Sequence, residues 1–119
     1  MMNKNINLEQ VQKKINKGDS FVLNLTASWC SDCTEQSSNL SAFNETLAVK
    51  NITVYSLMVQ EQKNIYLSSE HQYFTESVGG HGFPRTLLII NGEVVDADNV
   101  EIIAIEQLNK LAQKFLTQI

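Results

Sequence analysis

Hydrophobic positions recur along the chain with two different periods, and they predict an alternation of helices and strands. From Leu8 onward they follow the spacing of a helix, for which Asn7 suits the N-cap and Gly18 the end. The mostly apolar stretch 20–27 is instead typical of a buried central strand. A long amphipathic helix is then predicted over 31–49.

The alternation continues to the C-terminal end. We expect a strand over residues 52–59 and a helix over 64–77. Two strands over 86–90 and 93–96 and a last helix over 102–116 should follow. Asn91-Gly92 lies between the last two strands, and this dipeptide favours a tight hairpin because both residues tolerate positive φ. Those strands should therefore be antiparallel. The distance between strands 20–27 and 52–59 leaves room for a helical crossover, so these two should be parallel.

The predicted order α-β-α-β-α-β-β-α describes an α/β fold, with a central mixed sheet flanked by helices on both faces. We expect four strands in this sheet, or a very short fifth, because little more than Met2 to Ile6 precedes the first helix. No linker, low-complexity tract or internal repeat divides the chain. Residues 1–119 are therefore predicted to form a single domain.

Composition narrows the classes of function. The hydrophobic fraction is 43%, the charged fraction 18% and the net charge -4, values that are ordinary for a globular protein. Because binding to nucleic acid needs clustered cations, we expect no nucleic-acid partner. No stretch resembles a secretory signal or a membrane span. The sequence thus predicts a soluble, cytoplasmic protein, and we expect a monomer.

The candidate chemistry lies where the strand 20–27 gives way to the helix 31–49. Trp29-Cys30-Ser31-Asp32-Cys33 contains both cysteines of the chain. Cys30 should lie at or just before the helix N-terminus, where free backbone N–H groups and the helix dipole favour a thiolate. Cys33, one turn later, can reach the sulfur of Cys30. Such a pair can open a disulfide through a mixed disulfide and then release it.

A structural role and a metal site are the alternatives for these cysteines. Free cysteine often serves as a small buried hydrophobe, although a Cys-x-x-Cys pair at this junction argues against that. A zinc site, in a dimer, would need Cys30 and Cys33 with His71 and His81, whose separation exceeds the usual spacing of zinc ligands. We therefore predict neither a metal nor another bound cofactor.

At this point the sequence resembles the thioredoxin family over nearly its whole length. Residues 21–33 (FVLNLTASWCSDC) and 82–95 (GFPRTLLIINGEVV) carry the resemblance, in the order of the family. It implies a thioredoxin fold in which Pro84 is cis and lies beside the two sulfurs. It also implies that Phe83 offers backbone groups to an extended substrate segment and that Trp29 flanks the site. A cis X-Pro bond in a tight turn agrees with Pro84 being the sole proline.

The sequence departs from the family pattern near the cysteines. Thioredoxins usually carry a buried Asp six residues before the first Cys, which helps to move the proton of the resolving thiol; this chain has Asn24 there. An amide cannot act as a general base. The Lys that usually pairs with that Asp, on the next strand, is also missing. Ser56 stands at about the matching position. Asp32 puts a negative charge near Cys30, which disfavours its thiolate and predicts a more reducing pair.

Further departures lie around Pro84. Arg85 stands where a small or hydroxylated residue is usual, and we expect a solvent-facing cation at the strand start; the alternative is a contact with the thiolate or an acidic substrate group. His81 is expected to be a solvated loop residue, or else to border the groove. The segment 60–82 is longer than the usual connection of the family, and its role is open.

Together these observations predict a thiol:disulfide oxidoreductase in which Cys30 attacks and Cys33 resolves. Its partners would be protein disulfides and an external thiol reductant or reductase. The competing hypothesis is a thioredoxin-fold binding or adaptor module whose dithiol is vestigial or regulatory, which Asn24 and the long middle segment favour.

Overall fold

A computed structural model of the chain describes residues 4–119. The described elements are β1 (Lys4–Asn5), α1 (Leu8–Asn16), β2 (Phe21–Ala27), α2 (Ser31–Ser38), α3 (Ser41–Ala48), β3 (Val54–Gln62), β4 (Ile65–Tyr66), α4 (Ser69–Ser77), β5 (Arg85–Ile90), β6 (Glu93–Val100) and α5 (Ile105–Leu116). The strands form one mixed sheet in the order β1-β3-β2-β5-β6, and β4 pairs with β3 outside this path. The predicted α/β architecture is confirmed.

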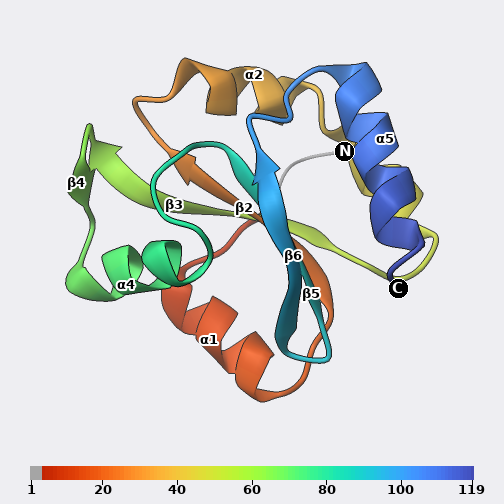
Figure 1. Ribbon diagram of the computed structural model, residues 1–119, viewed down its shortest axis with the longest axis horizontal. Coiled ribbons are helices and arrows are strands. Elements are labelled where there is room, and N and C mark those ends of the chain that lie inside the picture. Colours follow the sequence, from red (N-terminus) through yellow and green to blue (C-terminus); the bar gives the residue numbers. More distant parts are fainter. Residues whose placement is uncertain (1–3) are drawn as a thin grey trace.

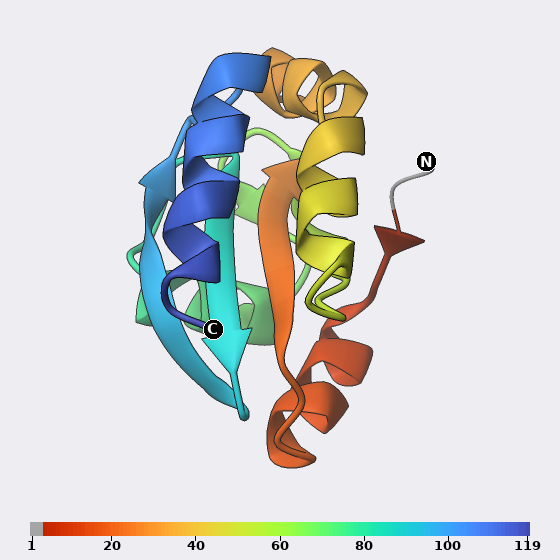
Figure 2. The same ribbon diagram turned by 90° about the vertical axis from the view of Figure 1, so that its right-hand side faces the viewer.

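Helices cover both faces of the sheet. Figure 2 shows α3 and α5 side by side on one face, with α1 and α4 on the other. Side chains alternate between the two faces along each strand, so β5 sends Leu87 and Ile89 toward one apolar cluster and Leu88 toward the other. The central strand β2 is buried along nearly its whole length, as its apolar sequence predicts.

The pairing of β2 brings distant segments together at one end of the sheet. It runs parallel to β3 and antiparallel to β5, and both directions agree with the sequence-based expectation. Asn24 pairs with Ser56 on β3 and with Thr86 on β5. The carboxyl end of β2, the carboxyl end of β3 and the start of β5 therefore meet at the same edge, which Figure 1 places beneath α2.

The predicted long helix over 31–49 is wrong in one respect, because the chain breaks it into α2 and α3. Asn39 ends α2 outside the helical region, with φ −104° and ψ 3°. Its side chain donates a hydrogen bond of 2.9 Å to the carbonyl oxygen of Ile103. Leu40 then turns into the core with 1% of its surface exposed. Packing against the segment before α5 thus overrides a helical pattern that continues in the sequence.

The helix predicted over 64–77 is also shorter than expected. Residues 65–66 form β4, which folds back on an extended β3, and α4 begins only after Ser68, whose hydroxyl accepts a hydrogen bond from the N–H of His71. Asn64 has φ 65° and makes the turn possible. With β1 and β4 the sheet has six strands where four or five were predicted. Part of the predicted N-terminal strand, Met2 and Asn3, lies outside the described residues.

The C-terminal half follows the prediction more closely. Asn91 and Gly92 both have positive φ, as expected for the tight turn between β5 and β6. β6 continues to Val100, past the predicted end at residue 96. The last helix begins at Ile105 and not at Ile102, because Ala104 takes the extended conformation of an N-cap.

Candidate functional site

The candidate site is built on the junction between β2 and α2. After Ala27 the backbone N–H of Ser28 donates a hydrogen bond to the carbonyl oxygen of Gln60. The N–H of Cys30 donates a hydrogen bond to the carbonyl oxygen of Ala27. Cys30 is the N-cap of α2, with φ −89° and ψ 109°. This geometry places its side chain at the end of the helix where N–H groups lack partners within the helix.

Backbone groups surround the sulfur of Cys30. It accepts a hydrogen bond of 3.2 Å from the N–H of Cys33, and its thiol donates to the carbonyl oxygen of Phe83 at 3.7 Å. The peptide bond between Phe83 and Pro84 is cis. Both cysteines are free thiols, with 7% and 6% of their surfaces exposed. The site therefore pairs a thiol capped by a helix N-terminus with a second thiol one turn away.

The thiol of Cys33 is protected against ionisation. Burial raises the pKa of Cys33 to about 12, and the hydrogen bond with the side chain of Cys30 and the charge of Asp32 act in the same direction. A hydrogen bond with the backbone of Ala27 opposes these effects without reversing them. Cys33 is therefore almost entirely a neutral thiol near pH 7.

Asn24 lies at the centre of a buried chain of hydrogen bonds. The hydroxyl of Thr86 donates to its Oδ1 over 2.6 Å, and Nε2 of Gln36 donates to that hydroxyl over 3.3 Å. Asn24 is fully buried, and its Nδ2 has no hydrogen-bond partner among the described residues. Because Oδ1 is engaged and Nδ2 is a donor, Asn24 cannot take a proton from a thiol.

A cavity with several hydroxyl side chains in its wall opens beside Cys33. It has a volume of about 360 Å³, and its lining includes the hydroxyl side chains of Thr26, Ser28, Thr34 and Ser56. Such walls hold water well, because each hydroxyl can both donate and accept. Solvent can therefore approach Cys33 from this side.

Three aromatic rings form a wall next to Cys30. Trp29 stacks on His81 with ring centroids 6.1 Å apart and planes inclined by 14°, and it meets the edge of Phe83 at 6.2 Å. His81 and Phe83 are in contact at 4.9 Å. His81 is an exposed loop residue, as expected, and its ring also packs against Trp29 and Phe83.

The β3–β4 hairpin holds Trp29 in place, and the sequence did not predict this contact. Oε1 of the fully buried Gln60 accepts hydrogen bonds from Nε1 of Trp29 (3.1 Å) and from the N–H of Asn64 (3.0 Å). Lys63 places its ammonium 5.6 Å from the centroid of the Trp29 ring. The only sequence signal for these contacts is the unusual length of this segment.

The prediction that Arg85 faces solvent is wrong. Only 6% of its surface is exposed, and Nη1 donates a hydrogen bond of 2.8 Å to the carbonyl oxygen of Ala97. Its guanidinium lies against Gly79, where a side chain would collide with it, and close to Gly82. The absence of side chains at these glycines provides the space for a large buried cation.

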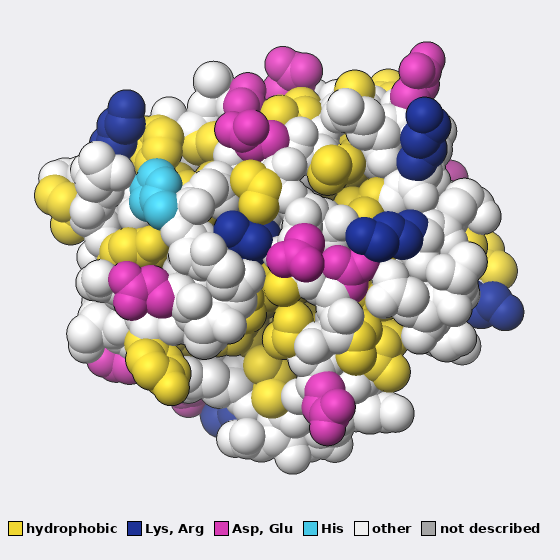
Figure 3. Space-filling view, in the orientation of Figure 1, with side chains coloured by type: hydrophobic (Ala, Val, Ile, Leu, Met, Phe, Trp, Pro, Cys, Tyr) yellow, Lys and Arg dark blue, Asp and Glu magenta, His cyan; other side chains and the backbone are white. Residues whose placement is uncertain are grey.

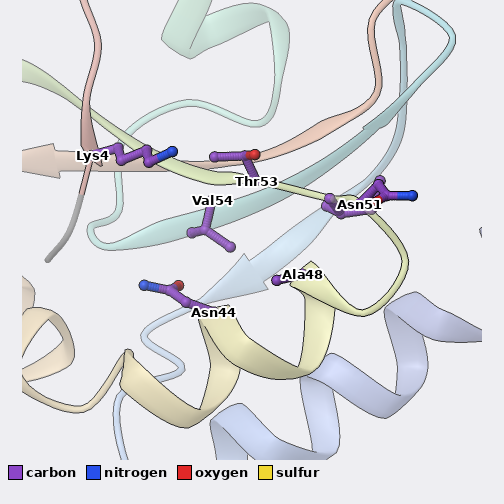
Figure 4. A pocket seen from close by; sticks show the side chains of 7 residues that line it. Lys4, Asn44, Ala48, Asn51, Thr53 and Val54 are labelled. Carbon is purple, nitrogen blue, oxygen red and sulfur yellow. The ribbon is translucent and has the colours of Figure 1, made fainter. Parts of the chain in front are cut away.

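Other features of residues 4–119 lie outside this site. These residues contain no cluster of three or more metal-ligating side chains, and no helix among them is long and apolar enough to cross a membrane. His71 interacts with Ser68 at the start of α4 instead. A cavity of about 290 Å³ lies between α3 and the start of β3. Figure 4 shows Asn44 and Val54 in its wall. It lies at the opposite end of β3 from the cysteines.

The sheet, the Cys-x-x-Cys pair at the end of its central strand and the loop with Pro84 define the thioredoxin fold.

The sequence matches no protein-family model and no curated protein. Solved structures are nevertheless similar to it throughout. Mitochondrial thioredoxin 3 of Saccharomyces cerevisiae has a TM-score of 0.65 at 16% identity and covers 94% of each chain. Thioredoxin of Malassezia sympodialis has a TM-score of 0.67 at 17% identity, over 94% of this chain and 89% of its own. Thioredoxin of Fasciola hepatica has a TM-score of 0.65 at 16% identity, over 93% of this chain and 97% of its own.

Proposed function

We propose that this protein is a thiol:disulfide oxidoreductase that reduces or exchanges protein disulfides through Cys30 and Cys33. The observation that carries the proposal is the position of Cys30 at the N-cap of α2, where its sulfur accepts a hydrogen bond from the N–H of Cys33. A negative charge on that sulfur is stabilised there, and the thiolate is the nucleophile in disulfide exchange.

In the proposed cycle Cys30 attacks one sulfur of a substrate disulfide and expels the other as a thiolate, which forms a mixed disulfide. Cys33 then loses its proton, attacks the sulfur of Cys30 and expels the second substrate thiolate. The substrate gains two electrons and the protein is left with a Cys30–Cys33 disulfide. An external thiol reductant or reductase returns two electrons, so no bound cofactor is needed.

The neighbouring groups are assigned roles by their positions. Phe83 and Pro84 would present backbone groups to an extended substrate segment, since the carbonyl of Phe83 already contacts Cys30. Trp29 would form the side wall. Asn24 and Asp32 would modulate the rate at which Cys33 releases the substrate, because neither favours the ionisation of Cys33. Arg85 would position the loop that precedes Pro84. We place this activity in a reducing compartment such as the cytoplasm, with a monomer acting on its substrates.

The test is reduction of a model protein disulfide by the reduced protein and by its Cys30→Ser variant. We expect loss of at least a hundredfold in rate, because the attacking sulfur is gone. The Cys33→Ser variant should accumulate covalent mixed disulfides, which mass spectrometry identifies, while a double-serine variant accumulates none. Equal rates for the unmodified protein and Cys30→Ser would instead favour the adaptor hypothesis, which Asn24 and the protected Cys33 support.

A further inference from the structure

The β3–β4 hairpin places a cation at the border of the candidate site. Lys63 lies at the tip of this hairpin, and its ammonium stands 5.6 Å from the centre of the Trp29 ring. His81 stacks on the same indole from the loop that follows α4. We call Lys63, Trp29 and His81 the rim. On the face in Figure 3, a Lys or Arg side chain, hydrophobic side chains and a histidine adjoin one another over this part of the molecule.

The position of Lys63 is fixed by its neighbours in the chain. Gln60 and Asn64 stand on either side of it, and Oε1 of Gln60 accepts hydrogen bonds from the N–H of Asn64 and from Nε1 of Trp29. Asn64 holds the turn at φ 65°. The same buried amide oxygen thus anchors both the turn and the indole. The hairpin tip that carries Lys63 is consequently anchored beside Trp29, the residue that precedes Cys30.

The charge of Lys63 is also available to a ligand. Within residues 4–119 no carboxylate lies at ion-pair distance from its ammonium. Its contact with Trp29 is a cation–π interaction at an exposed site, which leaves the ammonium largely in solvent. A charge of this kind on the edge of a binding surface alters association with charged partners more than it alters stability.

We propose that Lys63 selects disulfide substrates that carry an acidic residue beside the reacting cysteine. This inference rests on the proposed function and adds to it the class of substrate. An extended segment bound past Phe83 advances about 3.3 Å per residue, so side chains one or two residues from the reacting sulfur come within the range of the rim. Cys30 and Cys33 carry out the exchange unchanged, and Lys63 acts only on binding.

The experiment compares three disulfide peptides that differ at one position beside the cysteine, which is Glu, Gln or Lys. The unmodified protein should turn over the Glu peptide roughly threefold to tenfold more efficiently than the Lys peptide at low ionic strength, through KM and not kcat. Lys63→Gln should abolish this preference and Lys63→Glu should reverse it. Salt at about 0.5 M should remove it, because the Debye length shrinks below the distance between the charges.

A matched control is Lys50→Glu. Lys50 is also exposed and precedes the start of β3, at the end of the strand opposite the hairpin. Replacing it by Glu changes the net charge by the same amount as Lys63→Glu. We expect it to retain the preference for the Glu peptide. Turnover of all three peptides without a charge preference, or an equal effect of Lys50→Glu, would overturn the inference alone. Failure of the unmodified protein to turn over any of them would instead refute the proposed function, and the inference with it.

Discussion

The amide N–H of Cys33 points at the sulfur of Cys30, 3.2 Å away, while burial raises the pKa of the Cys33 thiol itself. The backbone of one cysteine therefore stabilises negative charge on the other, and its own side chain resists ionisation. This asymmetry gives the two residues different chemistry although they belong to the same helical turn. In the proposed cycle it assigns attack to Cys30 and release to Cys33.

The release step should depend steeply on pH. Since burial raises the pKa of Cys33 to about 12, its thiolate fraction increases about tenfold for each pH unit below that value. We expect the decay of a preformed mixed disulfide on Cys30 to accelerate throughout the range from about pH 6 to about pH 9. Rapid-quench kinetics measure this decay, and Cys33→Ser should show none. A rate that levels off near pH 9 would mean that the resolving thiol ionises like free cysteine, whose pKa is about 8.5.

A carboxylate at position 24 should accelerate release at neutral pH. In Asn24→Asp one carboxylate oxygen can keep the hydrogen bond from Thr86, and the other can accept a proton, which the amide cannot. We expect an increase of roughly tenfold or more in the rate of release near pH 7. Burial of the new carboxyl should lower the free energy of unfolding by about 1–3 kcal/mol. Asn44→Asp, at another buried asparagine remote from the cysteines, is the control, and equal rates in both variants would contradict the prediction.

Loss of the side-chain amide at position 60 should loosen the wall beside Cys30. Gln60→Leu deprives Nε1 of Trp29 and the N–H of Asn64 of their common acceptor, and the loss of each partly buried hydrogen bond should lower the free energy of unfolding by about 0.5–1.5 kcal/mol. Because Trp29 is the sole tryptophan, its fluorescence reports the change directly, and urea unfolding measures the stability. Gln62→Leu, at an exposed position of the same strand, should leave both nearly unchanged. A similar loss in the two variants would show that the amide of Gln60 has no special role.

Asp96 should stabilise the contact between β6 and α5. Burial by itself would raise its pKa, but hydrogen bonds from Gln118, Lys114 and Asn99 hold it below the ordinary value. A lowered pKa means that the contribution is present above the ordinary carboxyl pKa of about 3.9 and disappears as pH falls through the lowered value. Asp96→Asn should therefore cost about 1–2 kcal/mol in urea unfolding at pH 7 and less near pH 2. The exposed Asp98 provides the control variant, and the same loss from Asp98→Asn would refute the assignment.

Much of the fold followed from local pattern. The apolar run of β2, the Asn91-Gly92 turn and the N-cap at Asn7 each depend on residues within a few positions of one another. The position of Cys30 at the start of α2 also follows from residues close in sequence, because a Cys-x-x-Cys pair directly after a buried strand lies at the N-terminus of the next helix. These features were predictable since backbone propensity and burial act over short distances.

The remaining features depended on contacts between distant segments. Asn39 ends α2 because Ile103 offers it a carbonyl, and Arg85 is buried because two glycines leave space for its guanidinium. Neither contact can be inferred from the residues next to Asn39 or Arg85 in the chain.

The β3–β4 hairpin shows the same dependence. Gln60 joins Trp29 to the turn at Asn64 through one oxygen, and Lys63 approaches the indole from the same turn. The sequence by itself determined the central strands of the sheet, their direction of pairing and the place of the two thiols, because these follow from hydrophobic periodicity and helix ends. Only the tertiary structure decided which side chains surround the thiols, since a hydrogen bond or a close packing contact needs the three-dimensional positions of both partners.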